Sequence, residues 1–498
     1  MNTQPSQETP DGAGQVDSAP TAPVGVDTDP RDLGRTHLIG IGGAGMSAVA
    51  RLLLAHGVTV SGSDAQESMG LAHLREQGAA VVVGQRAENV HDVDTVVVST
   101  AIRETNPELA TARERGLTVV HRSDALAVSM HGSQVVAVAG THGKTTTSSM
   151  IAVMLEAAGV QPSWAIGAHV ADLGANAALG HGAWFVAEAD ESDGSFLKYA
   201  PTVAVVTNIE PDHLDHYGST EEFFQAFDDF TATMRPGGTL VACQDDAGSR
   251  ELARRTRDAG ARVLTYGTDP TSDISIQEIE SHGLGTSATL SVGEGADARR
   301  HRMALAVPGE HNVLNAAAAF AVSSAVGIPA EEALRGLTGF HGSARRFDLK
   351  GEGNGVRVFD DYAHHPTEVA AALTAARKVA GEHKVLALFQ PHLFSRTQAF
   401  AGEFAQALQI ADRAWVLPVF AAREDPVPGV SSALITDAGG ATVVAAAQPE
   451  DAVREIAQAA APGDLVLTIG AGDVTVHGPR LVEALAEGRT SGDAEPSS

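Results

Sequence analysis

Cysteine, lysine and long apolar runs are scarce in this chain of 498 residues. The only cysteine is Cys243, so no intramolecular disulfide can form, and the composition fits a reducing cytoplasm. No apolar run reaches the roughly 18 residues that a membrane-spanning helix needs, so we expect no membrane insertion. The N-terminal stretch, Met1 to Asp32, has neither a basic segment nor an apolar one, and we therefore expect no secretory signal there.

Positive charge is also limited. The chain has 34 lysines and arginines against 62 aspartates and glutamates, which gives a formal net charge of −28. This excess argues against nucleic acid or an anionic membrane as a partner, and it means that an anionic ligand needs a local basic pocket. The chain has only five lysines. The presence of one of them, Lys144, inside a glycine-rich loop therefore indicates a function rather than an ordinary solvent-exposed lysine.

Apolar runs alternate with helical patterns and group into three units, as the length also predicts. Valine-rich runs separated by amphipathic stretches indicate parallel sheets covered on both faces, so we predict an α/β protein. The predicted domains are an N-terminal Rossmann-like domain (35–132), a central P-loop domain with a parallel sheet (133–338) and a C-terminal Rossmann-like domain (339–487). The segments 1–34 and 488–498 lack hydrophobic periodicity, and we predict that both are disordered.

The most specific motif is Gly-Thr-His-Gly-Lys-Thr-Thr-Thr at residues 140–147. It follows an apolar run and precedes a helical pattern, which is the layout of a phosphate-binding loop. Backbone N–H groups and a helix N-terminus face the phosphates, Lys144 adds a charge, and the Thr145 hydroxyl can ligate Mg²⁺. Val138 stands where the strict pattern has its first glycine, so this is a shortened variant. A simple glycine turn before a helix is the alternative.

A second glycine loop, Gly40 to Gly45, matches Gly-x-Gly-x-x-Gly, and Asp64 follows at the end of the next predicted strand. This dinucleotide fingerprint, taken alone, favours a nicotinamide cofactor. A bare helix N-terminus, however, holds any diphosphate. Because another phosphate loop follows, we favour two phosphorylated substrates in one chain and keep a nicotinamide-dependent oxidoreductase as the alternative.

Two polar clusters, Glu188–Asp193 and Asn208–Asp215, follow predicted strands. Ligands of α/β proteins bind at the carboxyl ends of strands, and Mg²⁺ with phosphate is the natural occupant of clustered carboxylates. Ordinary polar loops are the alternative. The segment His311–Asn315 either caps an alanine-rich helix, with Asn312 as the N-cap, or contacts the edge of adenine.

These motifs, in this order, resemble those of the Mur ligases, the ATP-dependent amide-forming synthetases of peptidoglycan precursor assembly. The resemblance covers about residues 36–485. The segments that carry it are Gly40–Met46, Gly140–Thr147, Glu188–Asp193, Asn208–Asp215, His311–Asn315, Arg345–Phe347, Asp360–Glu368, Phe389–Thr397 and Gly470–Asp473. The acidic motif at 188–193, together with those at 360–366 and 389–392, is similar to the alanine-adding type of the family.

The resemblance implies the ligands and the residues that hold them. The implied substrates are ATP, UDP-N-acetylmuramate and L-alanine, with Mg²⁺ as the metal ion, a cytoplasmic location and a monomer or weak homodimer. The implied ATP residues are Gly140, Thr141, His142, Gly143, Lys144, Thr145, Thr146, His311, Asn312, Asn315, Arg345 and Asp360. The implied UDP-sugar residues are Gly42, Gly43, Ala44, Gly45, Met46 and Asp64.

The resemblance also implies an amino-acid site, in which Tyr362, His364 and Arg396 would position L-alanine. Thr145, Glu188 and His213 would ligate Mg²⁺. The implied catalytic set is Lys144, Glu188, His213, His364 and Arg396.

Two positions bear on the type of ligase. Leu393 stands where the family usually has an arginine, which removes one expected substrate contact. No lysine lies between Tyr199 and Asp348, where several sister ligases carry a carbamylated lysine, and this absence fits the alanine-adding type. A ligase that attaches a tripeptide to UDP-muramic acid is the second choice, because its acidic motif usually has tyrosine where Ser192 stands. A non-catalytic nucleotide-binding regulator is a further alternative, which the acidic clusters disfavour.

Overall fold

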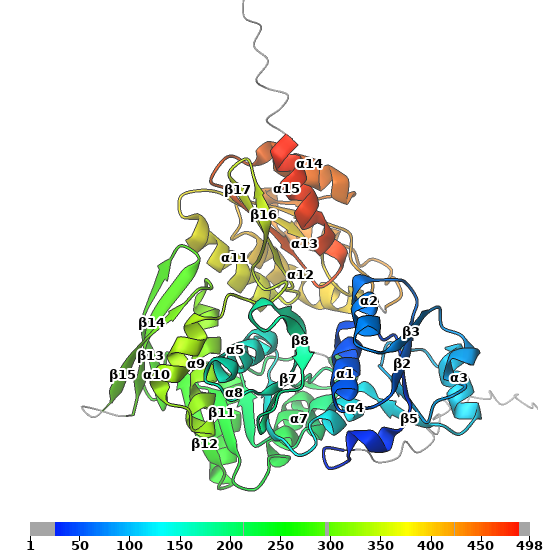
Figure 1. Ribbon diagram of the computed structural model, residues 1–498. Helices are drawn as coiled ribbons and strands as arrows, with labels where there is room; N and C mark the ends of the chain where they lie inside the picture. Colours follow the sequence, from blue (N-terminus) through cyan, green and yellow to red (C-terminus); the bar gives the residue numbers. More distant parts are fainter. Residues whose placement is uncertain (1–24, 213, 294–297, 423, 488–498) are drawn as a thin grey trace, which may run out of the picture.

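The computed structural model describes residues 25–212, 214–293, 298–422 and 424–487 (Figure 1). Within these residues the chain forms three sheets of five, ten and six strands, one after another along the sequence. The predicted α/β class with parallel sheets in three units is confirmed. His213 and the segments 1–24 and 488–498 lie outside the described residues. None of the helices in the described ranges is both long and apolar enough to cross a membrane.

The N-terminal sheet is entirely parallel, in the order β3-β2-β1-β4-β5. Its strands are β1 (Thr36–Ile39), β2 (Val60–Asp64), β3 (Ala80–Val83), β4 (Thr95–Val98) and β5 (Thr118–His121). Its helices are α1 (Ala44–Ala55), α2 (Met69–Glu76), α3 (Pro107–Glu114) and α4 (Arg122–Ser129). The strand order reverses between β1 and β4, so the glycine loop after β1 opens at the point where such sheets bind ligands.

The predicted N-terminal tail ends earlier than residue 34. Pro30–Leu33 form a 3₁₀ helix, η1, with Asp29 accepting a hydrogen bond from the Arg31 N–H at its start. Leu33 is buried in the core of the N-terminal domain. One apolar side chain among polar residues gives no periodic signal, which is why the sequence did not reveal this turn.

The central sheet has the order β15-β14-β13-β12-β11-β10-β6-β9-β7-β8. Its strands are β6 (Gln134–Ala139), β7 (Ser163–Val170), β8 (Ala175–Ala178), β9 (Trp184–Glu188), β10 (Val203–Val206), β11 (Thr239–Cys243), β12 (Arg262–Gly267), β13 (Ile274–His282), β14 (Gly285–Val292) and β15 (Arg299–Leu305). Its helices are α5 (Lys144–Ala157), α6 (Leu214–Tyr217), α7 (Thr220–Ala232), α8 (Ala247–Asp258), α9 (Glu310–Val326) and α10 (Ala330–Thr338). Strand β6 is parallel to both neighbours, β9 and β10, so the loops that follow these three strands meet at one edge.

Both ends of the central sheet are antiparallel, which the prediction of a parallel sheet did not include: β8 runs antiparallel to β7 at one end, and three strands form a meander at the other. Strands β13, β14 and β15 form a meander, and β13 joins β14 through the two-residue turn Gly283-Leu284. Gly283 has φ +61°, as hairpin turns of this length require. In the second half of β15 the buried side chains of Met303 and Leu305 alternate with exposed Ala304, which fits a strand with one solvent-exposed face.

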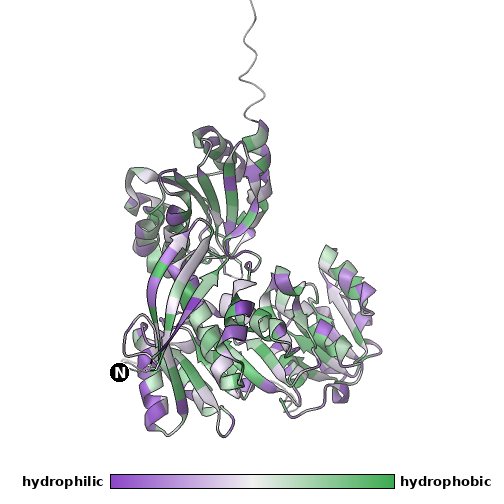
Figure 2. Cartoon of the chain, turned by 60° about the vertical axis from the view of Figure 1, so that its left-hand side comes forward, coloured by the Kyte–Doolittle hydropathy of each residue, from purple (hydrophilic) through white to green (hydrophobic). Residues whose placement is uncertain are grey.

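The C-terminal sheet has the order β16-β17-β21-β18-β19-β20, and only β16 is antiparallel to its neighbour. The strands are β16 (Asp348–Gly353), β17 (Val356–Asp361), β18 (Val385–Phe389), β19 (Arg413–Val416), β20 (Val443–Ala445) and β21 (Leu465–Ile469). The helices are α11 (Pro366–Ala380), α12 (Phe394–Leu408), α13 (Ala433–Ala438), α14 (Pro449–Ala459) and α15 (His477–Glu487). Its inner strands are strongly hydrophobic in Figure 2, as expected for strands covered on both faces.

Candidate functional site

The loop between β6 and α5 has the backbone of a phosphate cradle. Gly140 has φ +128°, and a Cβ there would clash with the Thr207 hydroxyl. Gly143 has φ +82°, and a Cβ there would lie 2.7 Å from the Asn315 Oδ1. Glycine is therefore needed at both positions. Helix α5 starts directly after Gly143, so its unpaired N–H groups face the loop.

Lys144 is held inside this loop. Its Nζ donates to the carbonyl oxygens of Gly140 at 2.6 Å and Thr141 at 3.1 Å, and it lies 2.8 Å from the Glu191 carboxylate. Burial opposes the ammonium charge, but the surrounding carboxylates, Glu191 first, outweigh it and hold the pKa of Lys144 above its ordinary value. The loop therefore carries a fixed positive charge.

Thr145 and Glu188, two of the residues that the resemblance implies as Mg²⁺ ligands, lie in contact. The Thr145 hydroxyl donates to Glu188 Oε1 at 2.8 Å, and the Gly167 N–H donates to Glu188 Oε2 at 2.6 Å. Because β9 lies beside β6, its last residue reaches the start of α5. Hydroxyl and carboxylate oxygens are the donors that Mg²⁺ prefers, so this pair fits the ion. The third predicted ligand, His213, lies outside the described residues.

A cavity of about 350 Å³, here the loop cavity, opens between the phosphate loop and the C-terminal domain. Six of the residues assigned to ATP line it: His142, Gly143, Thr146, His311, Asn312 and Asn315. Burial, with the charge of Arg346 adding to it, lowers the pKa of His311 to about 4, so its ring is neutral. A neutral imidazole beside two amides can pair with both donors and acceptors of a base.

The capping alternative for His311–Asn315 is wrong. Helix α9 begins at Glu310, and Gly309 is its N-cap. The Asn312 amide donates to the Pro308 carbonyl at 2.7 Å, and Asn315 Oδ1 accepts from the Thr147 hydroxyl at 3.1 Å. Asn315 therefore fixes α9 against the end of the phosphate-loop motif, and Asn312 fixes the start of α9 to the turn before it.

Arg345 and Asp360 do not line the loop cavity. Asp360 is fully buried and accepts hydrogen bonds from Arg345 Nε at 3.0 Å and Thr475 Oγ1 at 2.8 Å. The next residues along the chain, Arg346 and Asp361, line the cavity instead. Asp360 and Asp361 are successive residues of β17, so their side chains point to opposite faces of the strand. Arg345 and Arg346 lie in the turn before β16, where Arg345 has φ +61°. The sequence contains both doublets but does not reveal which member faces inward.

A second cavity of about 330 Å³, here the N-terminal cavity, lies between the first glycine loop and β9. Gly43, Ala44, Gly45 and Met46 line it, as assigned for the UDP-sugar, together with Arg122, Glu188 and Asp190. Neither Gly42 nor Asp64 is part of the lining. Asp64 Oδ2 accepts from the Gly42 N–H at 2.9 Å, and this contact holds the turn. Arg122, which the motif analysis missed, supplies the cation here.

A third cavity of about 620 Å³, here the central cavity, is lined by residues from all three domains. Arg103 comes from the N-terminal domain, Lys144 and Glu188 from the central one, and Tyr362 and His364 from the C-terminal one. In Figure 1 the C-terminal domain lies above the other two, with the central domain at the lower left and the N-terminal domain at the lower right. The residues assigned to ATP phosphates, metal and amino acid therefore border one space.

Arg396 and Leu393 also line the central cavity. Arg396 is only 6% exposed, and its Nη2 lies 3.2 Å from Asp212 Oδ2. Its Nε has no hydrogen-bond partner among the described residues. Leu393 is buried in a left-handed conformation, φ +70°, and precedes α12, so it adds apolar surface where the family usually has a charge.

His142 joins the phosphate loop to the C-terminal domain. Its Nε2 lies 3.1 Å from Glu210 Oε2, and its Nδ1 lies 3.2 Å from Glu368 Oε1 on α11. Burial opposes protonation, but the hydrogen bonds to the two carboxylates outweigh it and raise the pKa of His142 to about 9. Glu368 also accepts from the His364 N–H at 2.9 Å, so one chain of contacts runs from the loop to the central cavity. The sequence motifs at 208–215 and 360–368 contain Glu210 and Glu368, but nothing local pairs either carboxylate with His142.

Three α/β domains with two glycine loops and a shared central cavity define a nucleotide-binding enzyme that brings several substrates together. Comparison with known proteins gives the family. The model of the Mur ligase family, catalytic domain, matches residues 35–134, the Mur ligase middle domain matches 138–323, and the Mur ligase, glutamate ligase domain, matches 345–472. The chain belongs to the Mur ligase family.

Named relatives are similar over nearly the whole chain. The UDP-N-acetylmuramate–L-alanine ligase of Paenarthrobacter aurescens is 57% identical over 456 residues, 91% of this chain and 97% of that protein. The enzyme of the same name from Kineococcus radiotolerans is 53% identical and covers 94% of this chain and 100% of its own length. The crystal structure of UDP-N-acetylmuramate–alanine ligase from Thermotoga maritima superposes with a TM-score of 0.76 at 29% identity, covering 91% and 100%. A murein peptide ligase from Psychrobacter arcticus gives 0.67 at 25%, covering 91% and 98%.

The His142 contacts predict a pH-dependent contribution to stability. A raised pKa means that the stabilisation is fully present below pH 6.5 and is lost as pH rises through about 9. Glu210 and Glu368 have lowered pKa values, so both stay ionised throughout this window. We expect the thermal midpoint of wild type to exceed that of His142→Asn by a margin that shrinks between pH 6.5 and 9. A margin that does not change with pH would show that His142 is not charged in the fold.

Proposed function

We propose that this chain joins L-alanine to the carboxylate of UDP-N-acetylmuramate, with conversion of ATP to ADP and phosphate. The observation that carries the proposal is the central cavity, where the lysine of the phosphate loop meets Glu188 and the C-terminal group Tyr362, His364 and Arg396. The two relatives at 57% and 53% identity have this activity in their names. We place the reaction in the cytoplasm.

The chemistry requires an activated carboxylate, because oxide is too poor a leaving group for direct attack by an amine. Transfer of the γ-phosphoryl group of ATP to the muramyl carboxylate gives an acyl phosphate, and the amine of L-alanine then displaces phosphate. Triphosphate and carboxylate repel each other, so the ammonium of Lys144 offsets charge where they meet. Thr145 and Glu188 would hold Mg²⁺, which supplies further charge neutralisation when bound.

The N-terminal cavity suits the sugar nucleotide. Its glycine loop presents the N-terminus of α1 to a diphosphate, and Arg122 adds a positive charge. Glu188 and Asp190 border both this cavity and the central one, so the muramyl end of the substrate would extend toward Lys144. The loop cavity would take the nucleoside of ATP, with His311, Asn312 and Asn315 around the adenine.

The C-terminal domain would position the amino acid. Arg396 is buried, and its guanidinium can exchange the Asp212 carboxylate for that of L-alanine. Burial lowers the pKa of His364 to about 3, so its ring is neutral and adds no charge that would repel the ammonium of the incoming alanine. Leu393 limits the polar surface beside this group. Closure of the three domains around the cavity excludes water, which would otherwise hydrolyse the acyl phosphate.

Phosphate release measured with ATP, Mg²⁺ and UDP-N-acetylmuramate, with each amino acid in turn, tests the proposal. We expect L-alanine to give the highest kcat/KM and the product to contain one new amide bond. Release that requires an alanyl-glutamyl-diaminopimelate tripeptide instead would identify a peptide-recycling ligase and contradict the proposal.

Replacement of Lys144 tests the phosphate loop. We expect Lys144→Ala to lower kcat about 100- to 1,000-fold, the range for loss of one preorganised charge at a reacting centre. Binding of UDP-N-acetylmuramate, measured by calorimetry, should persist because Lys144 does not line the N-terminal cavity. Lys378→Ala is the control, since Lys378 pairs with Glu310 outside the three cavities described above. If the turnover of Lys144→Ala stayed within tenfold of that of wild type, the assignment of Lys144 to the ATP phosphates would be wrong.

Replacement of Arg396 tests the amino-acid site. We expect Arg396→Ala to raise the KM for L-alanine at least tenfold, while the KM for ATP changes little. Arg413→Ala serves as the control, because Arg413 packs over the Trp415 ring elsewhere in the same domain. Equal increases in the two KM values would mean that Arg396 supports the fold of the site rather than the carboxylate of alanine.

A further inference from the structure

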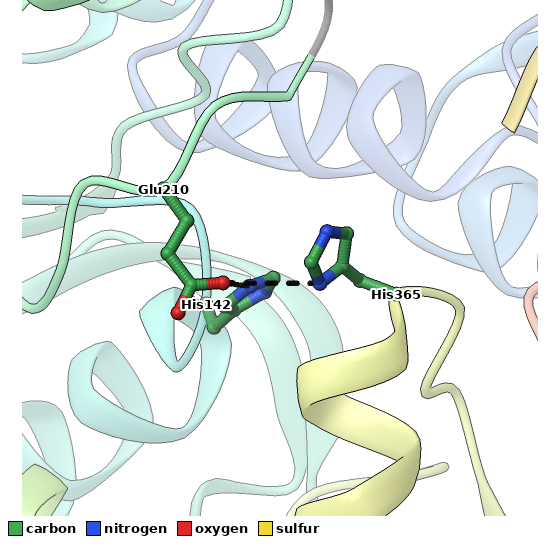
Figure 3. Close-up of side chains that lie close together, drawn as sticks. All are labelled: His142, Glu210 and His365. Carbon is green, nitrogen blue, oxygen red and sulfur yellow. Dashed lines mark hydrogen bonds and ion pairs between the residues drawn. The ribbon is translucent and has the colours of Figure 1, made fainter. Parts of the chain in front are cut away.

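Three side chains with metal-ligating atoms meet at the junction of the central and C-terminal domains (Figure 3). His142 comes from the phosphate loop, Glu210 follows β10, and His365 is the N-cap of α11. One ligand atom from each residue lies within 4.8 Å of the others. The three residues are brought together only by tertiary contacts between two domains, so no sequence motif indicates the cluster.

The separations suit a small metal ion. His142 Nε2 lies 3.1 Å from Glu210 Oε2, and His365 Nδ1 lies 3.9 Å from the same oxygen. Two ligands of a tetrahedral Zn²⁺ ion with bonds of about 2.0–2.1 Å lie roughly 3.4 Å apart. Small side-chain shifts would therefore bring all three atoms into coordination range. The fourth position would be filled by water, as in other sites with three protein ligands.

The donor set selects the class of metal. Two imidazole nitrogens and one carboxylate oxygen are ligands typical of Zn²⁺ and related transition metals. Mg²⁺ prefers oxygen ligands and retains its waters, so it is better matched by Thr145 and Glu188. The cluster would therefore hold a different ion from the one assigned to the reaction.

The surroundings already orient the ligands. His142 Nδ1 faces Glu368 Oε1 at 3.2 Å, and a carboxylate on the distal nitrogen is the usual partner of a metal-bound histidine. Thr367 Oγ1 donates to Glu210 Oε2 at 2.9 Å and holds that carboxylate in place. His365 is 6% exposed, and its Nε2 is buried without a hydrogen-bond partner among the described residues. His365 Nδ1 accepts a long hydrogen bond from the Thr367 N–H at 3.4 Å, and a bound ion would take the place of this contact.

We propose that His142, Glu210 and His365 form a binding site for a transition-metal ion of the Zn²⁺ class that bridges the central and C-terminal domains. The bound ion replaces the proton that His142 Nε2 shares with Glu210. Because its ligands come from both domains, it holds the domain junction closed. Zn²⁺ would then slow a reaction cycle in which the domains must separate to release products.

Zinc binding by the full chain tests the site without any substrate. The protein is stripped with a chelator and kept in excess Mg²⁺, which saturates the oxygen site, and Zn²⁺ is titrated against a chromogenic chelator. We expect one zinc equivalent in wild type and at least tenfold weaker binding in His365→Asn. Asparagine retains the N-cap of α11 because its side-chain oxygen can accept from the Thr367 N–H. His73→Asn, on an exposed face of α2, is the matched control and should bind like wild type.

Co²⁺ gives a second measurement that does not depend on a variant. We expect wild type in excess Mg²⁺ to show the intense visible absorption of four-coordinate Co²⁺, and Zn²⁺ to abolish it. Glu210→Gln should weaken both signals because it removes the charged ligand. Absence of this absorption, or equal zinc affinity of wild type and His365→Asn, overturns the site. In either case the assay of phosphate release judges the ligase function separately.

Inhibition gives the functional outcome. At zinc concentrations that fill the site, we expect wild type to lose turnover while His365→Asn retains a larger fraction of its own uninhibited rate. An equal fractional loss in the two proteins would mean that the ion does not act by bridging the domains.

Discussion

The pairing of β6 with β9 and β10 is the constraint on which the rest of the site depends. In the parallel register Val138 is paired with Glu188 on one side and with Val205 on the other. This alignment carries the three strand ends to one edge, so the phosphate loop, the Glu188 carboxylate and the segment from Asn208 onward start side by side. A shift of one residue in the pairing of β6 with β9 would turn the side chains of β9 to the opposite face of the sheet and separate Thr145 from Glu188.

Charge compensation inside the site follows from the acidity of the whole chain. With a net charge of −28, the protein as a whole repels triphosphate and sugar nucleotide, and attraction arises only where cations are buried close together. Lys144 is held by Glu191, and Arg396 by Asp212. Removing one member of such a buried pair is costly because it leaves the other unpaired. An anionic substrate that enters can exchange for the resident carboxylate, so these two buried cations are each paired before the substrate binds.

The sequence predicted the parts of the site that local patterns encode. Glycine spacing with the flanking strand and helix was enough for the loop at Gly140–Thr147, because those glycines are required by backbone geometry at that place. The grouping of Tyr362, His364 and Arg396 came from the family resemblance, and the structure does place them on one cavity. The resemblance implies Arg345 and Asp360, whereas Arg346 and Asp361 line the loop cavity. Which member of each doublet faces the cavity depends on the register of β17 and on the turn before β16, and the sequence of a doublet shows neither. The contact between His142 and Glu368 spans 226 positions, so only the folded chain reveals it.

Glu368 links the phosphate loop, the start of helix α11 and the central cavity. Its carboxylate borders both the loop cavity and the central cavity, with one oxygen facing the His142 ring and the other accepting from the His364 N–H. It also closes the capping box of α11, so its position is set by the start of that helix. A shift of the phosphate loop that moves His142 would therefore also move His364, the residue before the N-cap of α11, through Glu368. Coupling of this kind is reciprocal: if nucleotide binding orders His364 through Glu368, then an amino acid that orders His364 must tighten nucleotide binding by the same factor.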